Sequence, residues 1–197
     1  MRRKTFDAIV ASAGLLLAVV LLAAGGLLTW AHSFVDNQVH DQLAAQQIFF
    51  PKAGSESLND PAVKPYLQQY AGQQVVTGQQ AEAFANHYIA VHLKESGGGL
   101  TYAQLSEKSR ANPNDQKLAQ QVQTSFRGET LRGLLLNAYA FGKMSQIAMY
   151  AAIASFIAAA ALIALSILGF AHARHTAAER EVLPKFGGAQ PTPHGAA

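Results

Sequence analysis

The sequence predicts an all-α membrane protein, in which two antiparallel transmembrane helices extend into a small extracytoplasmic helical bundle. Residues 147–170 contain no charge and no proline. A helix over that range, at about 1.5 Å per residue, is long enough to cross a hydrocarbon core of about 30 Å. A second apolar stretch covers residues 8–31. Helices buried in soluble proteins rarely stay apolar on every face for this length, so lipid is the expected surrounding.

Composition agrees with two spans that flank a neutral domain. The 197 residues include 14% charged residues, whereas soluble domains carry about 25%. Basic and acidic residues are equal in number between the two apolar stretches, so the excess positive charge lies at the membrane flanks. A neutral middle domain offers no electrostatic field for nucleic acid. The absence of cysteine excludes disulfides, thiolate nucleophiles and cysteine-ligated metals.

The basic residues also predict an orientation. Arg2, Arg3 and Lys4 precede the first span, and Arg174 follows the second. The positive-inside rule then places both termini in the cytoplasm at a plasma membrane. We therefore expect a cytoplasmic N-terminus (1–7), transmembrane helix 1 (8–31), an extracytoplasmic domain (32–146), transmembrane helix 2 (147–170) and a partly disordered cytoplasmic tail (171–197).

A cleaved signal peptide is the alternative for residues 8–31. Its apolar core of roughly twenty residues exceeds the usual 7–15 of a signal, and no small-residue cleavage site follows. We therefore expect an uncleaved span. Trp30 on the first span and Tyr150 on the second would then lie at the outer membrane interface, which amphipathic rings prefer.

Apolar residues at helical spacing predict several helices between the spans. Val35, Val39 and Leu43 are four apart, so the first span should continue as a stalk until Phe50-Pro51 ends it. Residues 52–58 should form a loop. Asp60 and Pro61 should begin a helix that runs to about residue 71.

Two capping boxes predict the next helix starts. Thr77 with Gln80, and Thr101 with Gln104, have the required spacing. The first of these helices should run to the glycines at 97–99, and the second to about residue 110. From Asp115 the helical pattern continues without a stop into the second span.

No catalytic sequence signature is present, and the candidate chemistry is sparse. His87 and His92 are five apart, so they do not share a helix face as a metal-binding pair four apart would, although Glu95 could join His92. Packing or surface histidines are the simpler interpretation, and we expect no metal, cofactor or catalytic residue. Other paired histidines, without further support for a site, are His32 with His40 and His172 with His175.

Two further sets of residues are candidates for binding. Aromatic rings on the predicted short helices could line a ligand pocket, formed by Tyr66, Tyr70, Phe84, Tyr88 and His92. Small residues four apart could form a helix-packing seam, with Gly14 and Ala18 on one span and Ala151, Ser155 and Ala159 on the other. Alanine is so common in both spans that such rows also arise by chance.

Several segments together resemble a family of small two-span actinobacterial membrane proteins. They are residues 6–14, 41–43, 49–51, 72–78, 83–93 (Ala-Phe-Ala-Asn-His-Tyr-Ile-Ala-Val-His-Leu) and 126–142. The resemblance covers roughly residues 5–170 and implies the same two-span plan, without an established activity. Some such proteins carry the label of ring-opening dioxygenase. An iron dioxygenase needs a set such as two histidines and a carboxylate, and the sequence shows no convincing one.

The leading functional hypothesis is therefore a non-enzymatic integral membrane protein that scaffolds or modulates a partner complex in the cell envelope. Its expected partners are the lipid bilayer and either another membrane protein or further copies of itself, not nucleic acid. The alternative is a ligand-binding or sensor-like extracytoplasmic domain that signals through a partner. An enzyme is the third hypothesis.

Overall fold

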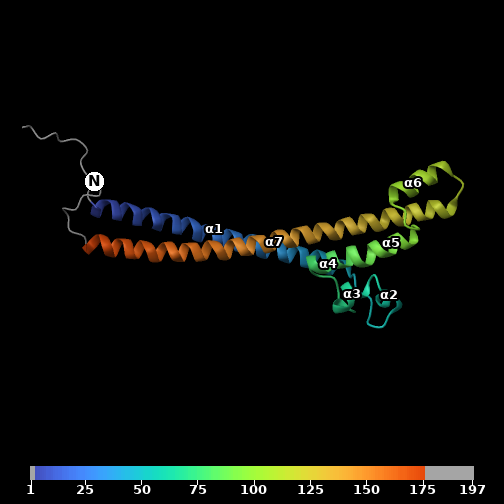
Figure 1. Cartoon of the computed structure of the whole chain (residues 1–197), viewed down its shortest axis with the longest axis horizontal. Coiled ribbons are helices and arrows are strands. Elements are labelled where there is room, and N and C mark those ends of the chain that lie inside the picture. The colour runs from blue at the N-terminus through green and yellow to red at the C-terminus, as the bar shows by residue number, and fades with distance from the viewer. Residues whose placement is uncertain (1–2, 176–197) are drawn as a thin grey trace, which may run out of the picture. The chain divides into compact units, whose positions relative to one another are not determined.

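The computed structural model describes residues 3–175, and these form helices and turns without a β-strand (Figure 1). The predicted all-α class is thereby confirmed for this part of the chain. Most of the predicted tail, from residue 176 onward, lies outside the described residues. The helices are α1 (Arg3–Gln46), α2 (Glu56–Asn59), α3 (Lys64–Leu67), η1 (Gln68–Tyr70), α4 (Gly78–Phe84), η2 (Ala85–Ile89), α5 (Ala90–Ser96), α6 (Tyr102–Ala111) and α7 (Gln116–His175).

Two helices are long and apolar enough to cross a membrane. They span Lys4–Gln46 and Gln116–His175, and the most apolar 18-residue window of each has a mean hydropathy of 2.5. Only 17% of each window is buried within the protein. A core helix of a soluble protein would be mostly buried, so the exposure of these windows suggests a lipid environment.

The chain divides into two compact units, of which one contains the apolar parts of α1 and α7. It comprises the described residues up to Leu27 and from Ala151 onward. Its buried positions recur every seven residues and are all small: Ala11, Ala18 and Gly25 on α1, and Ala152, Ala159, Ser166 and Ala173 on α7. A seven-residue period is typical of coiled-coil packing.

Small residues let the two helices of this unit approach closely. A Cβ atom added to Gly14 would lie 2.7 Å from Ser166 Oγ, and one added to Gly25 would lie 2.9 Å from the Phe156 ring. Of the predicted seam, Ala18 and Ala159 are fully buried. Gly14, Ala151 and Ser155 are half-buried, so the predicted residues lie on or beside the packed surface.

The other unit, Leu28–Tyr150, has its own hydrophobic core. Leu43 of α1 and Leu135 of α7 are buried there together with residues of the short helices. Phe50 is at its centre: its ring stacks on Tyr70 at 5.0 Å and meets the edge of Phe84 at 5.4 Å between centroids. The remaining core residues are Leu58, Val63, Leu67, Val75, Ala81, Ala83, Ala85 and Ile89.

The stalk ends earlier than predicted. α1 stops at Gln46, and Gln47 has a left-handed φ of 54°. The next residues are extended because their backbone pairs with a distant segment: Val75 N–H donates to Ile48 O at 2.8 Å, and Phe50 N–H donates to Gln73 O at 2.9 Å. The expected end at Phe50-Pro51 was therefore wrong by about one helical turn.

Two other local predictions also needed correction. The expected loop at 52–58 overlaps α2, which begins at Glu56 and buries Leu58 in the core. The expected helix at 61–71 begins later and changes type: the Asp60 carboxylate accepts from Ala62 N–H at 2.7 Å, α-helix covers Lys64–Leu67, and the 3₁₀ turn η1 continues it over Gln68–Tyr70. Burial of Leu58 and Val63 in one core favours turns over a single straight helix.

Helix starts set by capping boxes were predicted correctly. Thr77 begins α4 with Gln80, and Thr101 begins α6 with Gln104, each with both reciprocal hydrogen bonds. The predicted continuous helix after Asp115 is also confirmed as α7, and the Asp115 carboxylate accepts from Leu118 N–H at 3.0 Å. The helix predicted between residues 77 and 97 is interrupted by the π-helical segment η2.

Candidate functional site

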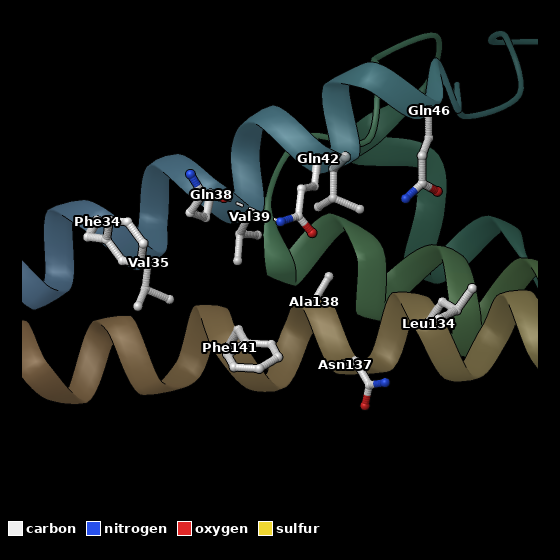
Figure 2. Close-up of a pocket in the computed structure, with 11 residues that line it drawn as sticks. Phe34, Val35, Gln38, Val39, Gln42, Gln46, Leu134, Asn137, Ala138 and Phe141 are labelled. Atoms are coloured by element: carbon white, nitrogen blue, oxygen red, sulfur yellow. Dashed lines mark hydrogen bonds between the residues drawn. The ribbon is translucent and has the colours of Figure 1, made fainter.

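An uncharged groove lies between α1 and α7 in the Leu28–Tyr150 unit (Figure 2). Its cavity volume is about 440 Å³, within the range of about 300–1,000 Å³ that is usual for ligand pockets. It is lined by the aliphatic and aromatic residues Phe34, Val35, Val39, Leu43, Leu134, Ala138 and Phe141, and by the amides Gln38, Gln42, Gln46 and Asn137. We call this cavity the amide groove.

Helical spacing arranges the α1 side of the amide groove. Val35, Val39 and Leu43 form the apolar row that the sequence predicted, and the three glutamines form a second row beside it, also four apart. On α7, Leu134, Ala138 and Phe141 supply the opposite wall at spacings of four and three. Residues four apart on a helix lie on one face, so each row presents a continuous surface.

The large apolar residues of the groove are not fully covered. Leu134 is 58% exposed and Phe141 is 53% exposed, although Leu135 between them in sequence is buried in the core. Such residues, rimmed by amides, mark a surface that a partner can cover. The lining residues carry no charged side chain, so the groove suits an uncharged occupant.

Trp30 and His32 lie on α1 next to the amide groove. The Trp30 ring is exposed and stacks on Phe34, a groove residue, with centroids 5.6 Å apart. His32 makes three contacts to the buried Ser145. Ser145 Oγ–H donates to His32 O at 3.1 Å, so His32 Nδ1–H is the donor to Ser145 Oγ at 2.7 Å and to Ser145 O at 3.1 Å. This reciprocal pair fixes the register between α1 and α7 beside the groove.

A second, polar cavity of about 360 Å³ lies between α3, α4, η2 and α7 of the same unit. It contains two charged side chains, Glu82 and Lys143. The Tyr66 and His87 rings form a flat wall, stacked at 3.7 Å between centroids with an interplanar angle of 6°. The other lining residues are Pro65, Gln69, Tyr70, Gln79, Ala83 and Tyr139. We call this cavity, which contains Glu82 and Lys143, the head cavity.

The structure does not bring the five predicted pocket residues into one cavity. Tyr66 and Tyr70 line the head cavity, whereas Phe84 is buried in the core. Tyr88 and His92 line a separate, more open cavity of about 410 Å³, where their rings lie 4.3 Å apart and His92 Nδ1–H donates to Tyr88 O at 2.9 Å.

The histidines do not assemble a metal site in the described part of the chain. No group of three His, Cys, Asp or Glu side chains converges there. His87 faces the Tyr66 ring, while His92 lies in the other cavity. His40 lies beside the exposed Asp41 at 3.3 Å, and His172 lies 3.9 Å from the Asp7 carboxylate.

Sequence reasoning missed the amide groove as a site. Its glutamine row and its valine row were both visible, but the α7 wall lies nearly a hundred residues away in sequence, and only the fold brings it close. The signal that was available was the row of uncharged amides beside an apolar row. No protein family, no curated protein and no solved structure matches this chain.

Proposed function

We propose that this chain is a non-enzymatic integral membrane protein that binds an apolar helix of a partner membrane protein in its amide groove. In this proposal, the groove is the partner-binding surface, and the two spans anchor the protein in the plasma membrane. The observation that carries the proposal is an open, uncharged groove between two helices that continue into candidate spans.

The two-span arrangement is supported by the order of the helix contacts. Ala11 meets Gly169, Gly14 meets Ser166 and Gly25 meets Phe156, so contact positions rise along α1 as they fall along α7. Antiparallel spans of this kind put both ends of the chain on one side. The three N-terminal basic residues favour the cytoplasm for that side.

A helix is the occupant that the groove suits best. Amphipathic or apolar helices lie in apolar grooves through residues at i, i+3, i+4 and i+7. The groove offers two parallel rows of this spacing on α1, one apolar and one of amides. Amides donate and accept hydrogen bonds without charge, so they can pair with polar side chains of a partner helix near lipid.

The experiment is co-purification of the full-length protein from native membranes in mild detergent. Leu134→Arg places a charge on an exposed groove residue, where it should not disturb the core. We expect the wild type to retain a stoichiometric membrane-protein partner and Leu134→Arg to lose it. Thr130→Arg is the matched control, since Thr130 is exposed on the same helix one turn away and does not line the groove.

Four results would contradict this proposal. One is a monodisperse wild-type monomer without any bound protein, and another is equal partner recovery with both arginine variants. A second copy of the chain as the only partner would place self-association in the groove instead. A bound small molecule without a protein would favour the second candidate, a ligand-binding domain, for which the groove volume of about 440 Å³ is also suitable.

A further inference from the structure

We propose that the head cavity binds the head group of a zwitterionic phospholipid, one that joins a phosphate to a primary ammonium. This site is separate from the amide groove. The proposal rests on the membrane insertion proposed above and is independent of any protein partner. It uses one cation and one anion in the same cavity, at a depth where phospholipid head groups lie.

The expected depth of the head cavity in the membrane follows from the helix geometry of α7. Lys143 precedes Ile147, where the predicted second span begins, by four residues. At about 1.5 Å per residue, the Lys143 backbone is about 6 Å along α7 from the start of that predicted span. The head-group layer is about 5–7 Å thick on each side, because the bilayer measures about 40–45 Å in total around a core of about 30 Å. Exposed Trp30 and Tyr150 lie near the ends of the two predicted spans, where interfacial rings are expected.

The charges of the cavity are those that a zwitterion needs. Lys143 Nζ donates to Gln146 Oε1 at 3.2 Å and lies 5.5 Å from the Tyr139 ring centroid. Glu82 Oε1 accepts from Asn86 Nδ2 at 2.8 Å. Neither side chain forms an ion pair with another residue in the stretch 3–175. A phosphate on Lys143 and an ammonium on Glu82 would satisfy both charges.

The walls of the cavity are held in place by packing. Gly78 lets α4 lie directly on α7, since a Cβ there would be 3.0 Å from Ala138 O. Asn86 links the Glu82 carboxylate to Arg132, whose NH2 group donates to Asn86 Oδ1 at 3.1 Å. The stacked Tyr66 and His87 rings complete one wall, and aromatic faces attract ammonium groups.

A purely anionic lipid fits less well. Its phosphate would gain Lys143, but Glu82 in the same cavity would repel it and would stay without a cationic partner. A choline head group has no N–H to donate to the carboxylate. The cavity therefore favours phosphatidylethanolamine over phosphatidylglycerol and phosphatidylcholine.

The test is a lipid titration of the delipidated full-length protein, followed by native mass spectrometry. The probes are phosphatidylethanolamine, phosphatidylglycerol and phosphatidylcholine with identical acyl chains. Lys143→Gln and Glu82→Gln remove the two charges. Lys117→Gln and Glu107→Gln are matched controls, because both residues are exposed and lie outside the cavity. Circular dichroism confirms that each variant keeps its helix content.

We expect phosphatidylethanolamine to bind most tightly. Lys143→Gln should weaken it about fivefold, corresponding to about 1 kcal/mol for one cation at a membrane surface. Glu82→Gln should weaken phosphatidylethanolamine by a similar factor and leave phosphatidylglycerol unchanged or tighter. Both controls should match the wild type. Partner recovery should stay normal in all four variants, which separates this site from the amide groove.

The proposal is overturned if the two cavity variants bind phosphatidylethanolamine as the wild type does, or if phosphatidylglycerol binds best. Water-soluble O-phosphoethanolamine distinguishes a lipid from a free metabolite. We expect it not to displace the lipid at equal concentration, and equal displacement would overturn the lipid assignment. Loss of the partner in Leu134→Arg with normal lipid binding would leave this inference intact.

Discussion

The helices α4 and α7 lie close together at Gly78, and substituting this residue tests how the Leu28–Tyr150 unit is packed. In Gly78→Ala, the new Cβ would lie 3.0 Å from Ala138 O and 3.1 Å from Tyr139 Cα. Both neighbours are backbone atoms, so no side-chain rotation relieves the contact. The helices must instead move apart by a few tenths of an ångström.

The expected magnitude follows from overpacking of a closely packed contact. Inserting a methyl group without room costs about 1–3 kcal/mol. The gain in helix propensity from glycine to alanine is at most about 1 kcal/mol and is smaller at the first residue of a helix. We therefore expect net destabilisation. For a chain of this size, each kcal/mol shifts Tm by about 2–4 °C, so Tm should fall by roughly 2–10 °C.

Gly133→Ala is the matched control, for which we expect a change in stability of the opposite sign. Gly133 is exposed within α7 and a Cβ there meets no atom within 4 Å. The substitution should therefore stabilise the helix by up to about 1 kcal/mol. Thermal unfolding of both purified variants, followed by near-ultraviolet circular dichroism, gives the comparison. Hydrogen exchange locates the effect, because Gly78→Ala should lower protection in α4 first.

The reasoning is refuted if Gly78→Ala melts at or above the wild-type temperature. It is equally refuted if the two alanine variants shift Tm in the same direction, because the argument depends on what surrounds each Cβ. A loss of hydrogen-exchange protection that is equal in all helices, and not largest in α4, would show that the Gly78 contact does not stabilise α4 in particular.

Two further substitutions test the remaining helix contacts by thermal unfolding. Ser145→Ala removes the hydroxyl of a residue that is 1% exposed and leaves His32 Nδ1–H only the Ser145 O acceptor at 3.1 Å, so we expect a loss of about 0.5–1.5 kcal/mol. An unchanged Tm would show that the pair contributes nothing. Ala159→Leu overfills a fully buried position between α1 and α7 and should destabilise the protein by about 1–3 kcal/mol. Its control, Ala158→Leu, is on the exposed face of the same helix and should leave the stability unchanged. Equal effects of the two leucines would contradict the packing described.

Sequence reasoning succeeded where the determinants are local. The capping boxes at Thr77 and Thr101 depend on residues three apart, so the start of each helix could be predicted from the sequence pattern alone. The same holds for α7, where an aspartate cap precedes a long helical pattern. These features need no knowledge of the rest of the chain.

The errors occurred where distant segments compete with local preference. Phe50 was expected to end the stalk, but its pairing with Gln73 unwinds the chain after Gln46. The π-helical segment η2 was not predicted, and its His87 stacks on Tyr66, whereas His92 lines another cavity, so Tyr66 and His92 do not share the pocket that was expected. Tertiary context overrides local propensity at such places.

The buried small residues of α1 and α7 recur at a spacing that differs from the predicted one. We expected small residues four apart, as in closely crossing membrane helices. The buried residues recur every seven, from Ala11 to Ala18 and from Ala152 to Ala159. Alanine fills other faces of both helices as well, so composition hides the repeat. Only burial separates the inward alanines from those that face outward.

Membrane orientation is tested most directly by single-cysteine accessibility in intact cells, since the natural chain has no cysteine. Thr5→Cys and Glu107→Cys are both at exposed positions, one in the first turn of α1, before the predicted span at 8–31, and one on α6. A membrane-impermeant maleimide should label Glu107→Cys in intact cells, and Thr5→Cys only after permeabilisation. Labelling of Thr5→Cys but not of Glu107→Cys in intact cells would contradict the account.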